Sequence, residues 1–178
     1  MKNNHIFILG GARSGKSKFA EDLALKEITN PKQKIAYIAT AKTNDDKEMQ
    51  SRIKKHVERR GASFITYEED LALDEAIINC AKNHDIIMID CLTIWLSNIG
   101  FAEKIDEKKN IKNLLLALEK TSNITIILVS NEVGLGIVPA NKVAREFVDK
   151  AGELNQKIAK ICNQVYFVTA GIPLKIKS

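Results

Sequence analysis

The sequence contains little that would cross-link its chain or place it in a membrane. Its three cysteines are an odd set without the CxxC spacing of zinc or redox sites, which favours reduced thiols in a cytoplasmic protein. No run of about 18 apolar residues occurs, so we expect no membrane span. The first apolar run, IFIL, stops after four residues and no small-residue cleavage site follows it, so we expect no signal peptide.

Segments that would separate domains are also absent. The sequence has no Pro/Gly-rich linker, no low-complexity stretch and no internal repeat, and its 178 residues are the size of one compact domain. Hydrophobic residues make up 45% and charged residues 28%, which is ordinary for a globular protein and argues against disorder. We therefore expect a single domain over residues 1–178.

The charge balance is mildly basic. The 27 Lys and Arg residues exceed the 22 Asp and Glu residues and give a net charge of +5. This excess favours anionic ligands such as phosphates, but it is modest for a nucleic-acid-binding protein. The most basic run, SRIKKHVERR at residues 51–60, has no aromatic residue for base stacking and is interrupted by acids. We therefore expect no nucleic-acid partner.

Short apolar runs alternate with longer helical patterns along the chain. Nearly continuous apolar runs are typical of strands buried on both faces of a parallel sheet. The expected strands are residues 6–9, 35–39, 86–89, 124–129 and 165–168, with a further candidate at 64–67. The expected helices are residues 16–28, 45–60, 71–82, 92–99, 107–120 and 141–162. The alternation predicts an α/β fold with a mostly parallel, doubly wound sheet that binds ligands at the carboxyl ends of its strands.

A phosphate-binding loop follows the first expected strand. Residues 10–17 read GGARSGKS, a Walker A pattern that stands between a buried strand and an amphipathic helix. Its glycines let backbone N–H groups turn toward phosphate oxygens, and the helix N-terminus adds partial positive charge. We predict that Lys16 reaches the β- and γ-phosphates and that the Ser17 hydroxyl binds Mg²⁺. The predicted nucleotide-binding residues are Gly10, Gly11, Ala12, Arg13, Ser14, Gly15, Lys16 and Ser17.

Asp90 ends the apolar run IIMID and has two interpretations. An acid at the end of a strand can hold Mg²⁺ beside the nucleotide, directly or through water, in the manner of a Walker B residue. It can also cap the helix that begins in the segment DCLT. The presence of a Walker A loop favours the metal role, and the sequence leaves the capping role open.

The basic run at 51–60 contains one of the three histidines. In a helix, Arg52, His56 and Arg60 lie on one stripe because four residues separate each from the next. Such guanidinium groups can clamp a triphosphate, and a neutral imidazole beside the α-phosphate can attack it to form a phosphoramidate. The residues taken by themselves fit a solvated helix face better.

Three segments together resemble one family. They are GGARSGKS at 10–17, RIKKHVERRG at 52–61 and, most specifically, SNEVGLGIVPANKVAREFVDKAGELNQKIA at 130–159. They resemble the bifunctional adenosylcobinamide kinase and adenosylcobinamide-phosphate guanylyltransferase of cobalamin biosynthesis. The resemblance covers nearly the whole chain. It implies a P-loop NTPase-like fold and a homotrimer.

The resemblance also implies two reactions that use ATP and GTP with Mg²⁺. In the first, a γ-phosphoryl group passes to the hydroxyl of adenosylcobinamide. In the second, GTP guanylylates His56, and GMP then passes to the corrinoid phosphate to give adenosylcobinamide-GDP and pyrophosphate. The residues implied for the guanine nucleotide site are Thr40, Ala41, Lys42, Val57, Glu58, Arg59, Arg60, Glu68 and Asp90, and Arg52 joins them as a phosphate ligand.

Glu132, in the NEVG segment, follows the fifth strand and is expected at the carboxyl edge of the sheet. It can accept the proton of the substrate hydroxyl, or it can order the glycine-containing turn, and both roles stay open. Two other functions compete with the family's two reactions. One is a P-loop kinase with a single activity on another small alcohol, and the other is a nucleotide-dependent module that binds nucleic acid.

Overall fold

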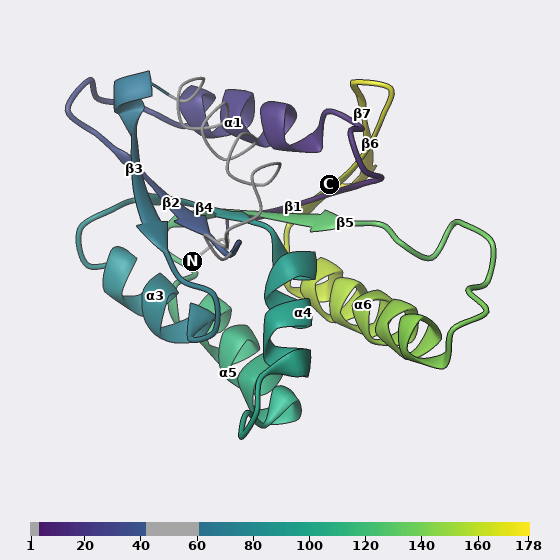
Figure 1. Ribbon diagram of the computed structural model, residues 1–178. Coiled ribbons are helices and arrows are strands. Elements are labelled where there is room, and N and C mark those ends of the chain that lie inside the picture. Colours follow the sequence, from purple (N-terminus) through teal and green to yellow (C-terminus); the bar gives the residue numbers. More distant parts are fainter. Residues whose placement is uncertain (1–3, 42–60) are drawn as a thin grey trace.

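The computed structural model describes residues 4–41 and 61–178 (Figure 1). The helix expected at 45–60 lies outside the described residues. The strands are β1 (Asn4–Gly10), β2 (Ile35–Ala39), β3 (Phe64–Glu68), β4 (Ile86–Asp90), β5 (Thr125–Asn131), β6 (Gln164–Thr169) and β7 (Ile172–Lys177). The α-helices are α1 (Lys16–Lys26), α3 (Leu73–Cys80), α4 (Leu92–Phe101), α5 (Glu107–Lys120) and α6 (Lys142–Ile161), and a short 3-10 helix, η1 (Gly61–Ser63), precedes β3.

The predicted α/β fold is confirmed. The seven strands form one sheet in the order β3-β2-β4-β5-β1-β6-β7, and every neighbouring pair is parallel except β6 and β7. In this order β5 lies between β4 and β1. The carboxyl ends of these three strands therefore bring Asp90, Asn131 and Gly10 to one edge of the sheet, where open α/β sheets bind ligands; Asn131 pairs with Gly10, and Asp90 pairs with Val129.

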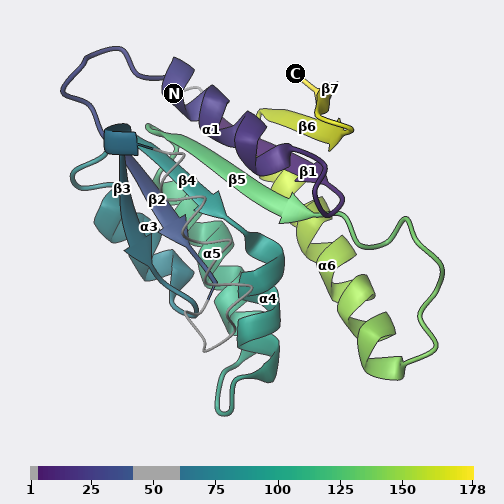
Figure 2. The ribbon, with the colours of Figure 1, turned by 45° about the horizontal axis from the view of Figure 1, so that its top comes forward.

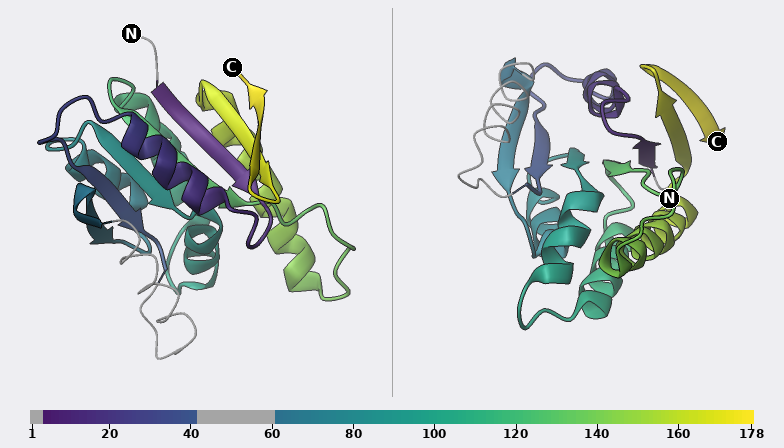
Figure 3. Two further views of the ribbon diagram at one scale, coloured as in Figure 1. Left: turned by 90° about the horizontal axis from the view of Figure 1, so that it is seen from above. Right: turned by 45° about the vertical axis from the view of Figure 1, so that its right-hand side comes forward.

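Helices cover both faces of the sheet. In the described residues α1 packs on one face and α3, α4, α5 and α6 pack on the other, as Figure 3 shows. The strand residues alternate between the two faces. In β1, Ile6 and Ile8 join the apolar cluster with α1, whereas Phe7 and Leu9 join the cluster with the other helices. Because both faces are buried, these strands need apolar residues at every position, which explains their continuous apolar runs.

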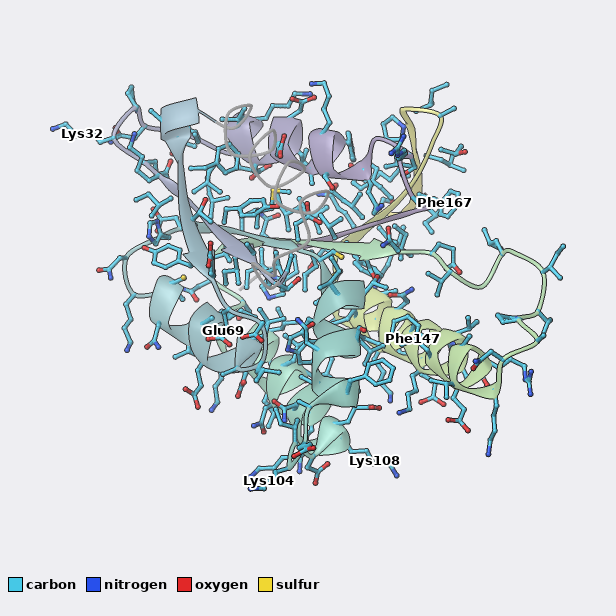
Figure 4. All side chains as sticks on the ribbon, viewed as in Figure 1. Lys32, Glu69, Lys104, Lys108, Phe147 and Phe167 are labelled. Atoms are coloured by element: carbon cyan, nitrogen blue, oxygen red, sulfur yellow. The ribbon has the colours of Figure 1, made fainter. Side chains whose placement is uncertain are left out.

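Side chains mark the beginnings of several helices. Asp106 accepts a hydrogen bond from the backbone N–H of Lys109 at the start of α5, and Asn141 accepts one from Ala144 at the start of α6. Where β3 leads toward α3, Glu69 Oε1 accepts from two backbone N–H groups, those of Leu71 and Ala72 (Figure 4). Such acceptors satisfy N–H groups that the helix itself leaves without partners.

Strand β7 is missing from the sequence-based expectation. It follows a tight turn at Ala170 and Gly171, which both have positive φ angles, and it pairs antiparallel with β6 at the sheet edge (Figure 2). Its signal is the alternation of IPLKIK, with Ile172, Leu174 and Ile176 on one face. All six of its residues are exposed, so the continuous apolar run of a buried strand is absent.

All three cysteines lie in the interior of the fold. Cys80, Cys91 and Cys162 are free and buried, and burial raises the thiol pKa of both Cys91 and Cys162 to about 12. Within residues 4–41 and 61–178, no helix has the length and apolar character needed to cross a bilayer.

Candidate functional site

The loop between β1 and α1 is closed by its own backbone. Arg13 and Gly15 have positive φ angles, 57° and 94°, which turn the chain from the strand into the helix. The N–H of Ser14 donates to the carbonyl of Gly11 at 3.2 Å, and the N–H of Gly171 donates to the carbonyl of Ser14 at 2.8 Å. The β6–β7 turn thus holds the loop from outside. A loop of this shape directs backbone N–H groups toward a phosphate.

Gly10 allows a close approach that no other residue permits. A Cβ atom at this position would lie 2.5 Å from Ser14 Oγ and closer still to the carbonyl oxygen of Val168 in the neighbouring strand. At Gly15, a Cβ would lie 3.1 Å from the Cα of Gly171, on a backbone conformation that side chains rarely adopt. The Walker glycines are therefore required by packing as well as by phosphate access.

Lys16 is the first residue of α1 and is only 8% exposed. Its Nζ donates to the carbonyl oxygen of Gly11 at 3.0 Å, so the ammonium group reaches back over the loop. Burial lowers the pKa of Lys16 below its ordinary value, while Cys91 and Asp90 nearby act to raise it. The side chain thus places its Nζ atom over the loop where phosphates would bind.

Asp90 lies on the same face of the sheet as α1, because it follows Met88 by two residues and Met88 packs in the α1 cluster. Its Oδ2 accepts a hydrogen bond from the hydroxyl of Tyr37 at 3.1 Å. The helix that follows begins at Leu92 with Cys91 as its N-cap and has no side-chain capping bond. The capping interpretation of Asp90 is therefore wrong.

Thr40 has a structural role that the sequence did not reveal. It is fully buried, and its hydroxyl both donates to the carbonyl of Cys91, at 2.8 Å, and accepts from the N–H of Cys91, at 2.9 Å. Its backbone carbonyl accepts from Asn98 of α4. Thr40 therefore joins the end of β2 to the segment that follows Asp90. Ala41 comes next and is half-buried, and Glu68 ends β3 at the outer side of the sheet.

Glu132 orders the turn after β5. Its Oε1 accepts from the N–H of Gly134 at 2.6 Å, and its own N–H donates to the carbonyl of Gly10 at 3.1 Å. The turn-ordering interpretation is thus confirmed, and the turn lies directly beside the Walker loop. The site residues predicted within the basic run and just before it lie outside the described residues; they are Lys42, Arg52, His56, Val57, Glu58, Arg59 and Arg60.

An apolar loop continues from this turn to α6, and Figure 1 shows it extending away from the sheet. Leu135, Ile137 and Val138 in it are 79%, 97% and 75% exposed. The loop and the first turns of α6 line a cavity of about 370 Å³. Arg145 holds the loop in place, since its Nη1 donates to the carbonyls of Pro139 and Ala140.

Two polar side chains near Gly10 have a buried oxygen that is unpaired among the described residues: Ser14, which the Walker pattern predicted, and Asn131, which was missed at the sequence level. Within the described part of the chain, Ser14 Oγ and Asn131 Oδ1 are buried and lack a hydrogen-bond partner. The backbone N–H of Asn131 donates to Thr93 Oγ1 at 2.7 Å, and that oxygen also lies 3.0 Å from Ser130 Oγ. The sequence signal for Asn131 was its place next to Glu132 at a strand end.

Comparison with known proteins shows which family the chain belongs to. The family described as "Cobinamide kinase / cobinamide phosphate guanyltransferase" matches residues 6–176. The chain belongs to this family. The resemblance seen in the Walker, basic and NEVG segments is therefore confirmed.

Relatives within the family match over nearly their full length. The "Bifunctional adenosylcobalamin biosynthesis protein CobP" of Pseudomonas aeruginosa is 42% identical over 170 residues, covering 96% of this chain and 95% of that protein. The "Bifunctional adenosylcobalamin biosynthesis protein CobU" of Escherichia coli is 35% identical over 186 residues, covering 97% of this chain and 99% of that protein.

A solved structure has a similar fold. The flagellar accessory protein FlaH of Methanocaldococcus jannaschii superposes with a TM-score of 0.57 at 14% identity, covering 99% of this chain and 79% of FlaH. At this identity the similarity extends to the fold alone. It agrees with the P-loop NTPase-like architecture expected from the Walker loop.

Proposed function

We propose that this chain catalyses both reactions of its family: phosphorylation of adenosylcobinamide, and transfer of GMP to the product. The observation that carries the proposal is the preformed Walker loop, with the buried Lys16 held over it, in a chain whose relatives are named bifunctional adenosylcobalamin biosynthesis proteins. A single-activity kinase would need the same loop. It would not need the basic run with its histidine.

In the kinase reaction, we assign the phosphates to the loop from Gly10 to Ser17. The acceptor hydroxyl oxygen attacks the γ-phosphorus, the bond to the β–γ bridging oxygen breaks, and the nucleoside diphosphate leaves. Lys16 neutralises charge on the phosphates in a buried setting, where its effect is larger than in water. We assign the hydroxyl proton to Glu132, which keeps one carboxylate oxygen beside the one that bonds Gly134.

In the transfer reaction, we assign the nucleophile to His56. An imidazole nitrogen forms a bond to the α-phosphorus of GTP as the α–β P–O bond breaks and pyrophosphate leaves. An oxygen of the corrinoid phosphate then attacks the same phosphorus, the P–N bond breaks, and His56 is regenerated. The remaining members of this proposed guanine nucleotide site are Thr40, Ala41, Lys42, Arg52, Val57, Glu58, Arg59, Arg60, Glu68 and Asp90.

Both reactions use nucleotides that bind with Mg²⁺. The Ser17 hydroxyl and the Asp90 carboxylate supply oxygen ligands of the kind that Mg²⁺ prefers, on the same face of the sheet. The described residues contain no cluster of three or more His, Cys, Asp or Glu side chains that would hold a metal alone, so Mg²⁺ would bind through the phosphates as well. The ion would polarise the phosphoryl oxygens.

We further propose that the corrinoid lies against the apolar loop between β5 and α6 and that the protein is a cytoplasmic homotrimer. The exposed side chains of Leu135, Ile137 and Val138, in the loop that continues from the Glu132 turn, support an acceptor with a large apolar surface. The exposed apolar face of β7 supports burial against another copy, which light scattering of the purified protein would test. Free, buried cysteines fit a reducing compartment.

Labelled GTP tests the proposal. Incubation with GTP labelled at the α-phosphate should leave acid-labile, base-stable label on the wild-type protein and none on His56→Ala. The Lys16→Ala variant should lose phosphorylation of adenosylcobinamide. Absence of label in the wild type, or label that persists in His56→Ala, would refute the covalent step. A kinase with one activity would release no pyrophosphate from GTP in the presence of adenosylcobinamide phosphate.

A further inference from the structure

Asn131, the last residue of β5, has a buried side-chain oxygen and has no role in the reactions proposed above. In the described part of the chain, Asn131 Oδ1 is shielded from solvent and has no hydrogen-bond partner. Buried polar atoms are normally bonded, because leaving one unpaired costs free energy. Such an atom beside a phosphate-binding loop points to a partner that arrives with the ligand.

The register of the sheet places Asn131 beside the start of the Walker loop. It lies opposite Gly10 in the β1–β5 pairing, and β5 separates β1 from β4, which ends at Asp90. In β5, Ile127 and Val129 pack in the α1 cluster. Because side chains alternate along a strand, Asn131 projects on the same face as α1. Its side chain therefore shares a face of the sheet with Asp90 and α1 and lies next to the first residue of the Walker loop.

The backbone around Asn131 is held on both sides. Its own N–H donates to Thr93 Oγ1 at 2.7 Å, and Thr93 Oγ1 lies 3.0 Å from Ser130 Oγ. The next N–H, that of Glu132, donates to the carbonyl of Gly10 at 3.1 Å. These bonds fix the backbone of Asn131 against both the start of α4 and the first residue of the Walker loop. The backbone that carries the Asn131 side chain is thus held in place.

We propose that Asn131 recognises the terminal phosphoryl group of a bound nucleoside triphosphate by donating a hydrogen bond from its side-chain amide. This inference deepens the proposed function, since it assigns a residue to the γ-phosphate of the same site. Phosphoryl oxygens only accept hydrogen bonds, and the amide has donors. The oxygen and nitrogen ends of an amide have nearly the same shape, so rotation by 180° brings a donor to the buried position at little cost.

A structural amide is the competing explanation, and Asn155 provides the control for it. Asn155 lies in α6, it is also buried, and its Oδ1 also lacks a partner in the described residues. It lies within a helix and not at one of the strand ends that form the site. A general effect of removing a buried amide should appear equally in both positions.

The test compares a triphosphate with a diphosphate in the presence of Mg²⁺. Calorimetry would measure the affinities of the β,γ-imido analogue of GTP and of GDP for the wild type, Asn131→Ala, Asn131→Asp and Asn155→Ala. Loss of a hydrogen bond to a charged group predicts that Asn131→Ala binds the triphosphate analogue about 10- to 100-fold more weakly. Its affinity for GDP should stay unchanged, because GDP has no γ-phosphate.

The nearly isosteric Asn131→Asp keeps the packing if alanine destabilises the fold, and its negative charge should weaken triphosphate binding still further. Asn155→Ala should leave the ratio of the two affinities unchanged. An unchanged ratio in both Asn131 variants would overturn the inference, and so would equal losses for the triphosphate and GDP. Neither ligand requires a corrinoid, so an altered ratio without phosphorylation of adenosylcobinamide would refute the proposed function and support this inference.

Discussion

Replacing Gly10 by alanine should damage both the stability of the fold and nucleotide binding. The added methyl group would lie 2.5 Å from Ser14 Oγ and closer still to the carbonyl oxygen of Val168. The Ser14 side chain can rotate away. The Val168 carbonyl cannot, because β6 pairs with β1 on one side and with β7 on the other. The strain must therefore move the backbone of the sheet or of the loop.

The expected magnitude follows from overpacking of a rigid core. Such substitutions typically cost about 1–3 kcal/mol, which in a protein of this size lowers the Tm by about 2–12 °C. The displaced loop should also bind GTP more weakly by about 10- to 100-fold, since small misplacements of binding groups carry penalties of this order. Urea and thermal unfolding would measure the first effect, and calorimetry the second.

Gly11→Ala is the matched control. A Cβ at Gly11 meets no atom within 4 Å, and its φ angle lies outside the left-handed region. Its stability should stay within about 0.5 kcal/mol of the wild type. The reasoning would be refuted if Gly10→Ala were as stable as the wild type, or if both alanine variants lost the same stability. In either case the contact with Val168 would not be the reason for a glycine at position 10.

Two further predictions concern buried polar groups of the site. Burial lowers the pKa of Lys16 from 10.5, so in the pH range just below 10.5 the unfolded chain binds more protons than the folded protein. The stability of the wild type relative to Lys16→Met, measured by urea unfolding, should therefore increase as the pH rises toward 10.5. A stability difference that does not change with pH would contradict this. Thr40→Val should lower the free energy of unfolding by about 1–3 kcal/mol, because it leaves the backbone N–H and carbonyl of Cys91 without their partner. Thr40→Ser keeps the hydroxyl and should retain this stability. Equal stability of the two variants in thermal unfolding would show that the hydroxyl is not needed.

Much of this site could be predicted because its signals are local in sequence. The Walker pattern combines a buried strand, a glycine-rich turn and a lysine at a helix start within a few residues, and each part has its own physical cause. The five apolar runs were recognisable as strands because both faces of the sheet are covered. Strand β7 was missed because the side chains on both of its faces are exposed, so its only signal was a short alternation of apolar and other residues.

The rest depends on contacts between distant segments. The family resemblance implied Thr40 as a nucleotide ligand, yet its hydroxyl is fully engaged with Cys91, which lies more than fifty residues later in the chain. Asp90 resembled either a metal ligand or a helix cap, and only the helix start at Leu92 excluded the cap. Asn131 became a candidate only when the register placed it opposite Gly10. Side-chain chemistry can be predicted from sequence, but the use of that chemistry depends on the partners that the fold supplies.

The contacts of Lys16 also explain how its amine can be buried at the Walker loop. Burial disfavours the charged form of Lys16, and the bond to the Gly11 carbonyl together with the nearby Asp90 partly compensates for lost hydration. A triphosphate would offer the ammonium group full negative charges in place of one carbonyl dipole. Because the loop is already closed by the Gly11–Ser14 and Ser14–Gly171 bonds, little backbone ordering remains to oppose binding. On binding, the main local change would then be that Lys16 replaces its bond to the Gly11 carbonyl with a bond to a phosphate oxygen. The free energy gained from this replacement would contribute to nucleotide affinity.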